Sequence, residues 1–166
     1  MAFKRLQWFP LALAAMALML LVTVKAQACI IGTPGNDVLV GTPNVDCIYG
    51  RAGNDDIYGL AGNDNLWGEE GDDYMSLGDG DDYADGESEN DQLYGGAGND
   101  YVIGWDGDDF LSGQGAHDSL YGWTGNDDIL GGWGNDTIDA HGGFDAIDGG
   151  DHTDTCLNGE IVANCP

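Results

Sequence analysis

One nine-residue unit is repeated through most of the chain, and it constrains the possible folds more than any other feature. Starting at Gly32, fourteen consecutive units run to Leu157 without an insertion or a deletion. Glycine occupies position 1 in twelve units and position 4 in ten, aspartate occupies position 6 in all fourteen, and position 8 is apolar throughout. A register kept this long predicts a repeat architecture in which each unit packs on its neighbours.

Each unit contains the residues of a turn followed by those of a very short strand. Glycine at positions 1 and 4 and Asn or Asp at position 5 predict a six-residue turn, because these residues tolerate positive φ. Positions 7–9 predict a strand whose single apolar side chain faces inward. Two units close a coil of 18 residues, and coils stack at about 4.8 Å. We therefore predict an all-β, right-handed parallel β-roll, a solenoid of about seven coils.

The units resemble those of the repeats-in-toxin (RTX) family, the hemolysin-type calcium-binding repeat. The segments GGAGNDYVI (95–103) and GGWGNDTID (131–139) match the family pattern GGxGxDxUx at every fixed place, and the resemblance covers 32–157. It implies that Ca²⁺ binds between stacked turns and stabilises the roll. Each ion would be held by position-6 aspartates and by backbone carbonyls of the glycine-rich turns.

The resemblance assigns a metal-binding role to specific residues. Seven turns on each edge leave six gaps, so up to about twelve ions are expected. The side-chain ligands would be Asp37, Asp46, Asp55, Asp64, Asp73, Asp82, Asp91, Asp100, Asp109, Asp118, Asp127, Asp136, Asp145 and Asp154. The backbone ligands would include Gly53, Gly62, Gly71, Gly98, Gly107, Gly125 and Gly134. We expect the clearest sites at 50–73, 95–109 and 122–136, and weaker ones where turns depart from the pattern at Val45, Leu77, Glu89, Ala116, His117, Phe144, His152 and Thr153.

The charge of the chain favours cations as partners. Lys4, Arg5 and Lys25 are the only charged residues in 1–28, so removing them changes the formal charge from −26 to −29. Such a surface repels nucleic acid and anionic membranes. The carboxylates would also repel one another, and the apolar interior is thin. We therefore expect the metal-free chain to be largely unfolded and calcium to induce folding after export.

The N-terminus has the pattern of an export signal. Lys4 and Arg5 precede an apolar run from Leu11 to Val24, and Ala26-Gln27-Ala28 forms a small-x-small cleavage site. We predict a signal peptide at 1–28 and a single domain at 29–166, with no membrane span in the mature chain; a permanent anchor is the alternative. The expected location is extracellular, on a bacterial surface, or in the periplasm.

Four cysteines lie in the exported part, in two pairs near its ends. Three pairings are possible, and the economical one joins Cys29 to Cys47 and Cys156 to Cys165, which would staple a cap at each end of the roll. A zinc site is disfavoured, because the spacing lacks CxxC-like pairs.

No constellation in the sequence favours catalysis, and we predict that the chain is not an enzyme. His117, His141 and His152 fall at different repeat positions, outside any known catalytic motif. Ice binding is disfavoured, because position 3 holds a single threonine. The alternative function is calcium-dependent adhesion to a polysaccharide or a surface protein. It would use outward aromatic rows formed by Tyr49, Tyr58, Trp67, Tyr74, Tyr83, Tyr94, Tyr101, Phe110 and Tyr121, with Trp105 and Trp123 stacked on one edge.

Overall fold

The computed structural model describes residues 28–165, which contain β-strands and no helix. The predicted export signal, apart from Ala28, lies outside these residues. No helix that could cross a membrane occurs between residues 28 and 165. The strands are β1 (Ile30–Ile31), β2 (Val38–Val40), β3 (Cys47–Ala52), β4 (Asp56–Ala61), β5 (Asn65–Glu70), β6 (Tyr74–Asp79), β7 (Tyr83–Ser88), β8 (Gln92–Ala97), β9 (Tyr101–Asp106), β10 (Phe110–Gly115), β11 (Ser119–Thr124), β12 (Asp128–Trp133), β13 (Thr137–Gly142), β14 (Ala146–Asp151), β15 (Thr155–Leu157) and β16 (Ile161–Ala163).

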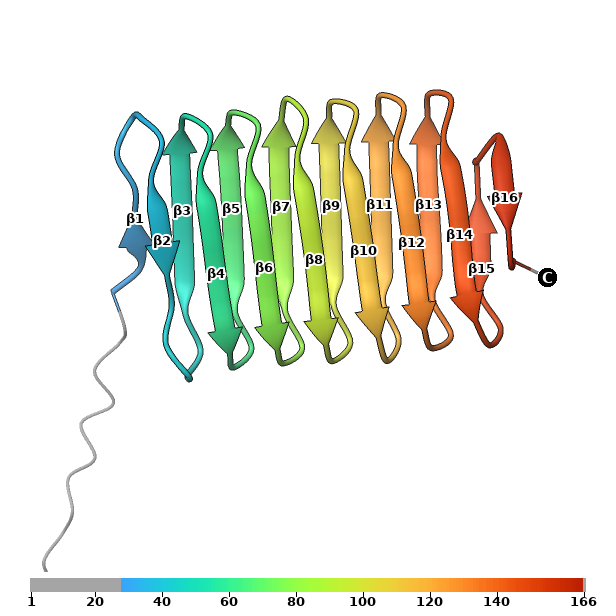
Figure 1. The fold of residues 1–166 in the computed structure, drawn as a ribbon, viewed down its shortest axis with the longest axis horizontal. Coiled ribbons are helices and arrows are strands. Elements are labelled where there is room, and N and C mark those ends of the chain that lie inside the picture. The colour runs from blue at the N-terminus through green and yellow to red at the C-terminus, as the bar shows by residue number, and fades with distance from the viewer. Residues whose placement is uncertain (1–27, 166) are drawn as a thin grey trace, which may run out of the picture.

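Successive strands alternate between two parallel sheets, as Figure 1 shows. The odd sheet has the order β1-β3-β5-β7-β9-β11-β13-β15, and the even sheet the order β16-β14-β12-β10-β8-β6-β4-β2. Neighbouring strands pair in register one coil apart, for example Leu111 with Ile129. The predicted all-β solenoid of about seven 18-residue coils is confirmed.

The twelve strands from β3 to β14 are six residues long, so the predicted division into a six-residue turn and a three-residue strand was wrong for these units. Each long strand covers positions 7–9 of one unit and positions 1–3 of the next, as in β10 from Phe110 to Gly115. Only positions 4–6 remain as a tight turn. The ladder between β10 and β12 passes from Ser112–Leu130 to Gln114–Gly132 and skips position 1, because the backbone at position 2 takes a positive φ.

Three positions of each unit face the interior, since positions 6, 8 and 1 alternate along the chain. Position 8 supplies the apolar core that the sequence predicted, with Leu39 and Cys156 partly buried at the ends. Leu77 and Ala140 replace glycine at position 1 and are fully buried, so they enlarge the core rather than disturb a turn. The position-8 core residues are Ile48, Ile57, Leu66, Met75, Ala84, Leu93, Val102, Leu111, Leu120, Ile129, Ile138 and Ile147.

Both ends of the roll extend beyond the repeats. The predicted disulfides Cys29–Cys47 and Cys156–Cys165 are both present. At the first end, β1 pairs with β3 before the first unit begins. At the last end, a shortened connection brings β16 alongside β14, with Ala146 paired to Ile161 only 15 residues later. The repeat pattern gave no indication of β16, because its period is broken there.

Glycine at position 4 is required by the backbone in most turns. Gly107 has φ +147°, and a Cβ there would lie against the carbonyl oxygen of Glu89 in the preceding coil. Glu89, Ala116 and His152 occupy the same position with φ of 70°, 88° and 93°. A side chain at this position therefore requires a different backbone conformation.

We predict that Gly107→Ala lowers the free energy of unfolding of the calcium-loaded protein by about 1–3 kcal/mol, the usual cost of a strained backbone. Gly35→Ala is the matched control, because Gly35 holds the same position in the first turn and its Cβ would meet nothing within 4 Å. We expect it to change stability by less than about 0.5 kcal/mol. Urea denaturation at saturating calcium measures both, and equal losses would contradict the steric explanation.

Candidate metal centres

The position-6 aspartates point into the roll and form one column along each edge. Asp37, six further aspartates and then Glu160 follow one edge, and the column from Asp46 to Asp154 follows the other. Except for Asp37, which is partly exposed, these aspartates are at most 4% exposed. The sequence predicted the two columns and the spacing of 18 residues within them, but it did not predict that the carboxylates are buried.

One carboxylate oxygen of each inner aspartate is hydrogen-bonded to the coil before it. Asp55 Oδ1 accepts from the backbone N–H of Asp37 at 2.7 Å, and Asp91 Oδ1 accepts from that of Asp73 at 2.8 Å. Twelve such bonds of 2.7–3.0 Å join the coils. At the last coil Glu160 takes the place of an aspartate, since its Oε2 accepts from Asp145 N–H at 2.7 Å. This role of Glu160 was not predicted.

The second oxygen of the same aspartates is buried and has no hydrogen-bond partner. A carboxylate oxygen left in this state is costly unless it is protonated or meets a cation. There are twelve of these oxygens, which equals the number of gaps between turns. They are the Oδ2 atoms of Asp55, Asp64, Asp73, Asp82, Asp91, Asp100, Asp109, Asp118, Asp127, Asp136, Asp145 and Asp154.

Ten of the twelve unpartnered oxygens lie beside the position-1 glycine of their own unit, and the other two, in Asp82 and Asp145, belong to units that begin with Leu77 and Ala140. A Cβ added to Gly59 would lie 2.7 Å from Asp64 Oδ2 and against the carbonyl oxygen of Leu77 in the next coil. At Gly131 the corresponding Asp136 Oδ2 lies at 2.7 Å. Position 1 is glycine because carboxylate and carbonyl oxygens converge where a side chain would be. The positive φ predicted for this glycine was wrong, because no position-1 glycine adopts it.

Burial raises the pKa of eleven of these aspartates, although the backbone N–H from which each accepts a hydrogen bond acts in the opposite direction. The pKa of Asp91 rises to about 9. The pKa rises to about 7 at Asp73, Asp100, Asp109 and Asp118 and to about 6 at Asp64 and Asp127, and it is also raised at Asp55, Asp82, Asp136 and Asp145. Without a cation, burial therefore favours the protonated form of these carboxyl groups.

This donor set fits Ca²⁺ better than it fits a transition metal. It consists of carboxylate and backbone carbonyl oxygens, which hard cations prefer. Between residues 28 and 165, no group of three or more His, Cys, Asp or Glu side chains is arranged to hold a metal ion. A calcium site here would therefore combine aspartates of stacked coils with backbone carbonyls. Mg²⁺ fits less well, because it requires a tighter octahedral shell.

The predicted backbone ligands at position 4 lie at the tips of the turns. Gly53, Gly71 and their equivalents adopt positive φ, and a Cβ on Gly71 would lie against the carbonyl oxygen of Gly53. The glycines that lie beside the aspartate Oδ2 atoms are those at position 1, which the prediction omitted. The sequence could have indicated these glycines, because position 1 is glycine in twelve of the fourteen units.

Position 5 supplies a second ladder on the outside of the turns. Asn99 N–H donates to Asp81 Oδ1 at 2.8 Å, and Asn126 N–H donates to Asp108 Oδ1 at 2.7 Å. His117 joins this ladder, since its Nδ1 accepts from Asn135 N–H at 2.7 Å. Position-5 residues do not adopt positive φ, so the reason predicted for Asn and Asp there was wrong. Their side chains bond the next coil instead.

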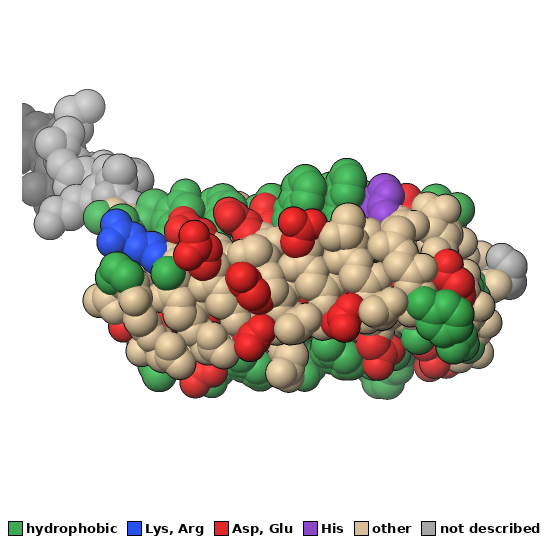
Figure 2. Space-filling model, turned by 90° about the horizontal axis from the view of Figure 1, so that it is seen from above, with side chains coloured by type: hydrophobic (Ala, Val, Ile, Leu, Met, Phe, Trp, Pro, Cys, Tyr) green, Lys and Arg blue, Asp and Glu red, His purple; other side chains and the backbone are tan. Residues whose placement is uncertain are grey.

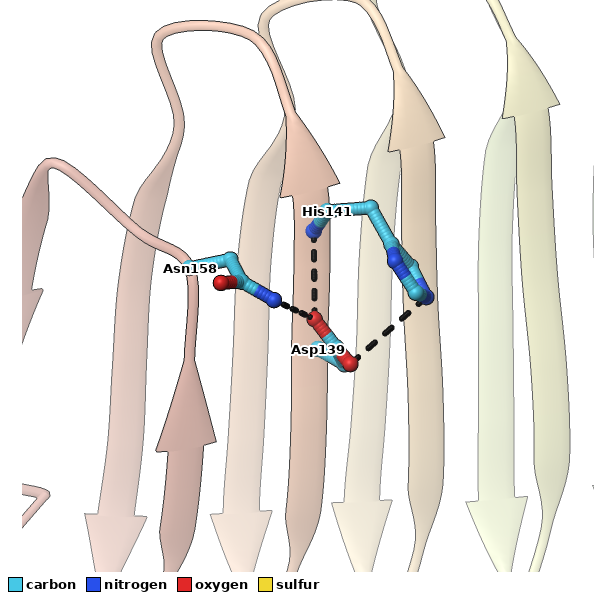
Figure 3. Close-up of polar contacts among 3 residues, drawn as sticks. All are labelled: Asp139, His141 and Asn158. Atoms are coloured by element: carbon cyan, nitrogen blue, oxygen red, sulfur yellow. Dashed lines mark hydrogen bonds and ion pairs between the residues drawn. The ribbon is translucent and has the colours of Figure 1, made fainter.

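His141 lies outside both columns, on the surface of the odd sheet (Figure 3). Its Nε2 is 3.6 Å from Asp139 Oδ2, and its backbone N–H donates to Asp139 Oδ1 at 3.3 Å. Asn158 also donates to Asp139 Oδ1. These contacts fix the histidine beside a carboxylate, but they include no hydroxyl or thiol that could act as a nucleophile.

Comparison with known proteins identifies a family match over most of the chain. The model described as RTX calcium-binding nonapeptide repeat (4 copies) matches residues 31–66, 49–84, 77–111, 85–119, 106–138 and 130–160. No curated protein sequence gives a significant match. The overlapping matches extend over the two aspartate columns and Glu160.

Proposed function

The chain belongs to the RTX calcium-binding nonapeptide repeat family, and we propose that it binds a row of Ca²⁺ ions along each edge of the roll and folds when it does so. The observation that carries this proposal is the set of twelve buried aspartate oxygens without a partner. Twelve ions would bring +24 and reduce the formal charge of the mature chain from −29 to about −5.

The proposed role is structural and non-enzymatic, in a protein that is exported before it folds. RTX solenoids are typically structural and extracellular. Extracellular calcium modules bind at about 10⁻⁴–10⁻³ M, so their sites fill outside the cell and stay empty in the cytosol. Two disulfides are consistent with an oxidising compartment. Binding and folding are then one event, because the aspartate columns form only when coils stack.

Native mass spectrometry of the mature chain tests the proposal, and we expect up to about twelve bound Ca²⁺ ions. Asp91→Asn should lose one or two of them, because Asp91 sits in mid-column between two gaps. Asp128→Asn is the matched control, since Asp128 is exposed at position 7 on the same side of the roll and should keep the full number. A wild-type chain that binds no calcium in this experiment would refute the function.

A second candidate is calcium-dependent adhesion through the outer aromatic rows. The odd sheet carries a row in which Tyr49 stacks on Trp67 with ring centroids 4.5 Å apart. On the even sheet Tyr74 and Tyr94 lie 5.4 Å apart. Neighbouring rings cover each other's faces, so a ligand could contact only the ring edges and the last ring at each end of a row. Polysaccharide pull-down with and without calcium tests this role, and absence of binding in both conditions leaves the structural role alone.

A further inference from the structure

A second kind of row follows position 2 on the outer face of the odd sheet. Trp105 and Trp123 stack with centroids 4.6 Å apart and planes 14° apart, and Trp123 and His141 stack at 4.3 Å and 18°. Figure 2 shows hydrophobic side chains gathered along one edge of the molecule, with acidic groups among them and a histidine beside them. From the first coil to the last, the row consists of Arg51, Glu69, Glu87, Trp105, Trp123 and His141.

The backbone holds these six side chains in a conformation that favours glycine. Their φ values lie between 65° and 87°. The even sheet has glycine at the same position in four strands, namely Gly78, Gly96, Gly132 and Gly150. Large side chains at positive φ are uncommon and costly. The even sheet has such side chains in only two strands, Leu60 and Gln114, whereas the odd sheet has an unbroken run of six, which indicates that this face has a use.

A cavity lies at the Trp105 end of the three-ring stack. Both faces of Trp123 are covered, by Trp105 and by His141, whereas the neighbour of Trp105 in the preceding coil is Glu87. Between these coils is a cavity of about 400 Å³, lined by Asp85, Glu87, Ser88, Trp105 and Asp106. One indole ring and three carboxyl groups therefore surround a single space.

Asp85 is an unusual member of this lining, because it sits on the outer face of the sheet and is nonetheless only 9% exposed. Its Oδ2 accepts a hydrogen bond from the Tyr83 hydroxyl at 3.0 Å, while its Oδ1 is buried and unpartnered. Burial raises the pKa of Asp85, although the Tyr83 hydroxyl, the Trp105 indole N–H and the Glu87 backbone N–H act in the opposite direction. A cation in the cavity would stabilise its ionised form.

We propose that this cavity binds an organic cation. Its substituted ammonium group would lie against the face of the Trp105 ring that Trp123 does not cover, among the carboxyl groups of Asp85, Glu87 and Asp106. An aromatic ring attracts a cation over its face, and tryptophan does so most strongly. The three carboxyl groups are not arranged to hold a metal ion, which favours a cation of diffuse charge. A neutral sugar would lack the attraction to the carboxylates. The site is separate from the calcium columns, which lie inside the roll.

Calorimetric titration of the calcium-saturated mature chain with choline tests the site, and 3,3-dimethylbutan-1-ol serves as the neutral compound of the same shape. We expect choline to bind at least about tenfold more tightly than the alcohol, since the positive charge is what the ring and the carboxylates recognise. Nα-acetyl-lysine methylamide is titrated in parallel. Tighter binding of choline would indicate a lipid-type headgroup as the natural ligand, and tighter binding of the lysine derivative would indicate a protein side chain.

Substitutions then locate the binding. Trp105→Ala and Glu87→Gln should each weaken choline binding about tenfold or more. Trp133→Ala and Asp79→Asn are the matched controls and should change nothing, because Trp133 is 71% exposed and both residues belong to the even sheet. Circular dichroism with calcium shows that each variant is folded, so loss of binding is distinguished from loss of the roll. Equal binding of choline and the alcohol, no binding of either cation, or equal losses in the control variants would overturn the proposal.

Discussion

Removing calcium at neutral pH should abolish the β-sheet circular dichroism of the mature chain. Without metal, twelve buried carboxylate oxygens have no partner. Each coil buries too little apolar surface to offset the cost of these oxygens. Its inward positions hold two aliphatic side chains, two aspartates and two residues that are glycine in most coils. The disulfides cannot substitute, since they close segments of only 18 and 9 residues at the ends of the chain.

The measurement is a far-ultraviolet titration of the metal-free protein with CaCl₂ in a buffer near pH 7.5. We expect the β spectrum to return cooperatively, because each bound ion joins coils that then favour the next. MgCl₂ at equal ionic strength is the control for simple screening of the charge, and it should restore little structure. A β-rich spectrum that persists in excess EGTA would show that the interior is sufficient without metal.

Acid should fold the metal-free chain that neutral buffer unfolds. The unfolded aspartates titrate near 3.8, whereas in the roll the pKa of Asp91 is raised to about 9 and that of Asp109 to about 7. A group with a raised folded-state pKa contributes stability that is fully present below 3.8 and is lost as the pH rises through the folded value. Protons at low pH remove the negative charge of the buried carboxyl groups, which calcium compensates at neutral pH. The metal-free roll should therefore be more stable at pH 5 than at pH 8.

Thermal melting followed by circular dichroism at these two pH values tests the effect, in buffers freed of metal on a chelating resin, because EGTA holds calcium poorly in acid. We expect a cooperative melt at pH 5 and none at pH 8. At saturating calcium the direction should reverse, since calcium requires ionised carboxylates and protons compete for them. If the metal-free chain melted at the same temperature at both pH values, its aspartates would not be buried as described.

On the outer face of the odd sheet, residue spacing predicted which aromatic residues are neighbours but not which side chains are buried. The sequence placed Tyr83 and Tyr101 one coil apart, and their rings indeed stack with centroids 5.8 Å apart. It did not indicate that Asp85 would lie nearly buried between Trp67 and Ile103 on adjacent strands. Burial on an outer sheet face depends on the side-chain conformations of the neighbouring aromatic residues, which the spacing of residues does not determine.

The sequence by itself determined the roll, its period, the inward position-8 residues and the aspartate columns, and it favoured the observed disulfide pairs as the most economical of three pairings. It could do so because a solenoid converts spacing along the chain directly into contacts between adjacent coils. Only the tertiary structure decided that positions 6 and 1 also face inward, that Asp91 and its equivalents leave one oxygen unpartnered, and that Glu160 completes a column. Those features depend on how each carboxylate lies against the first residue of its own unit and against the backbone N–H of the coil before it, and the spacing of residues along the chain does not give these distances.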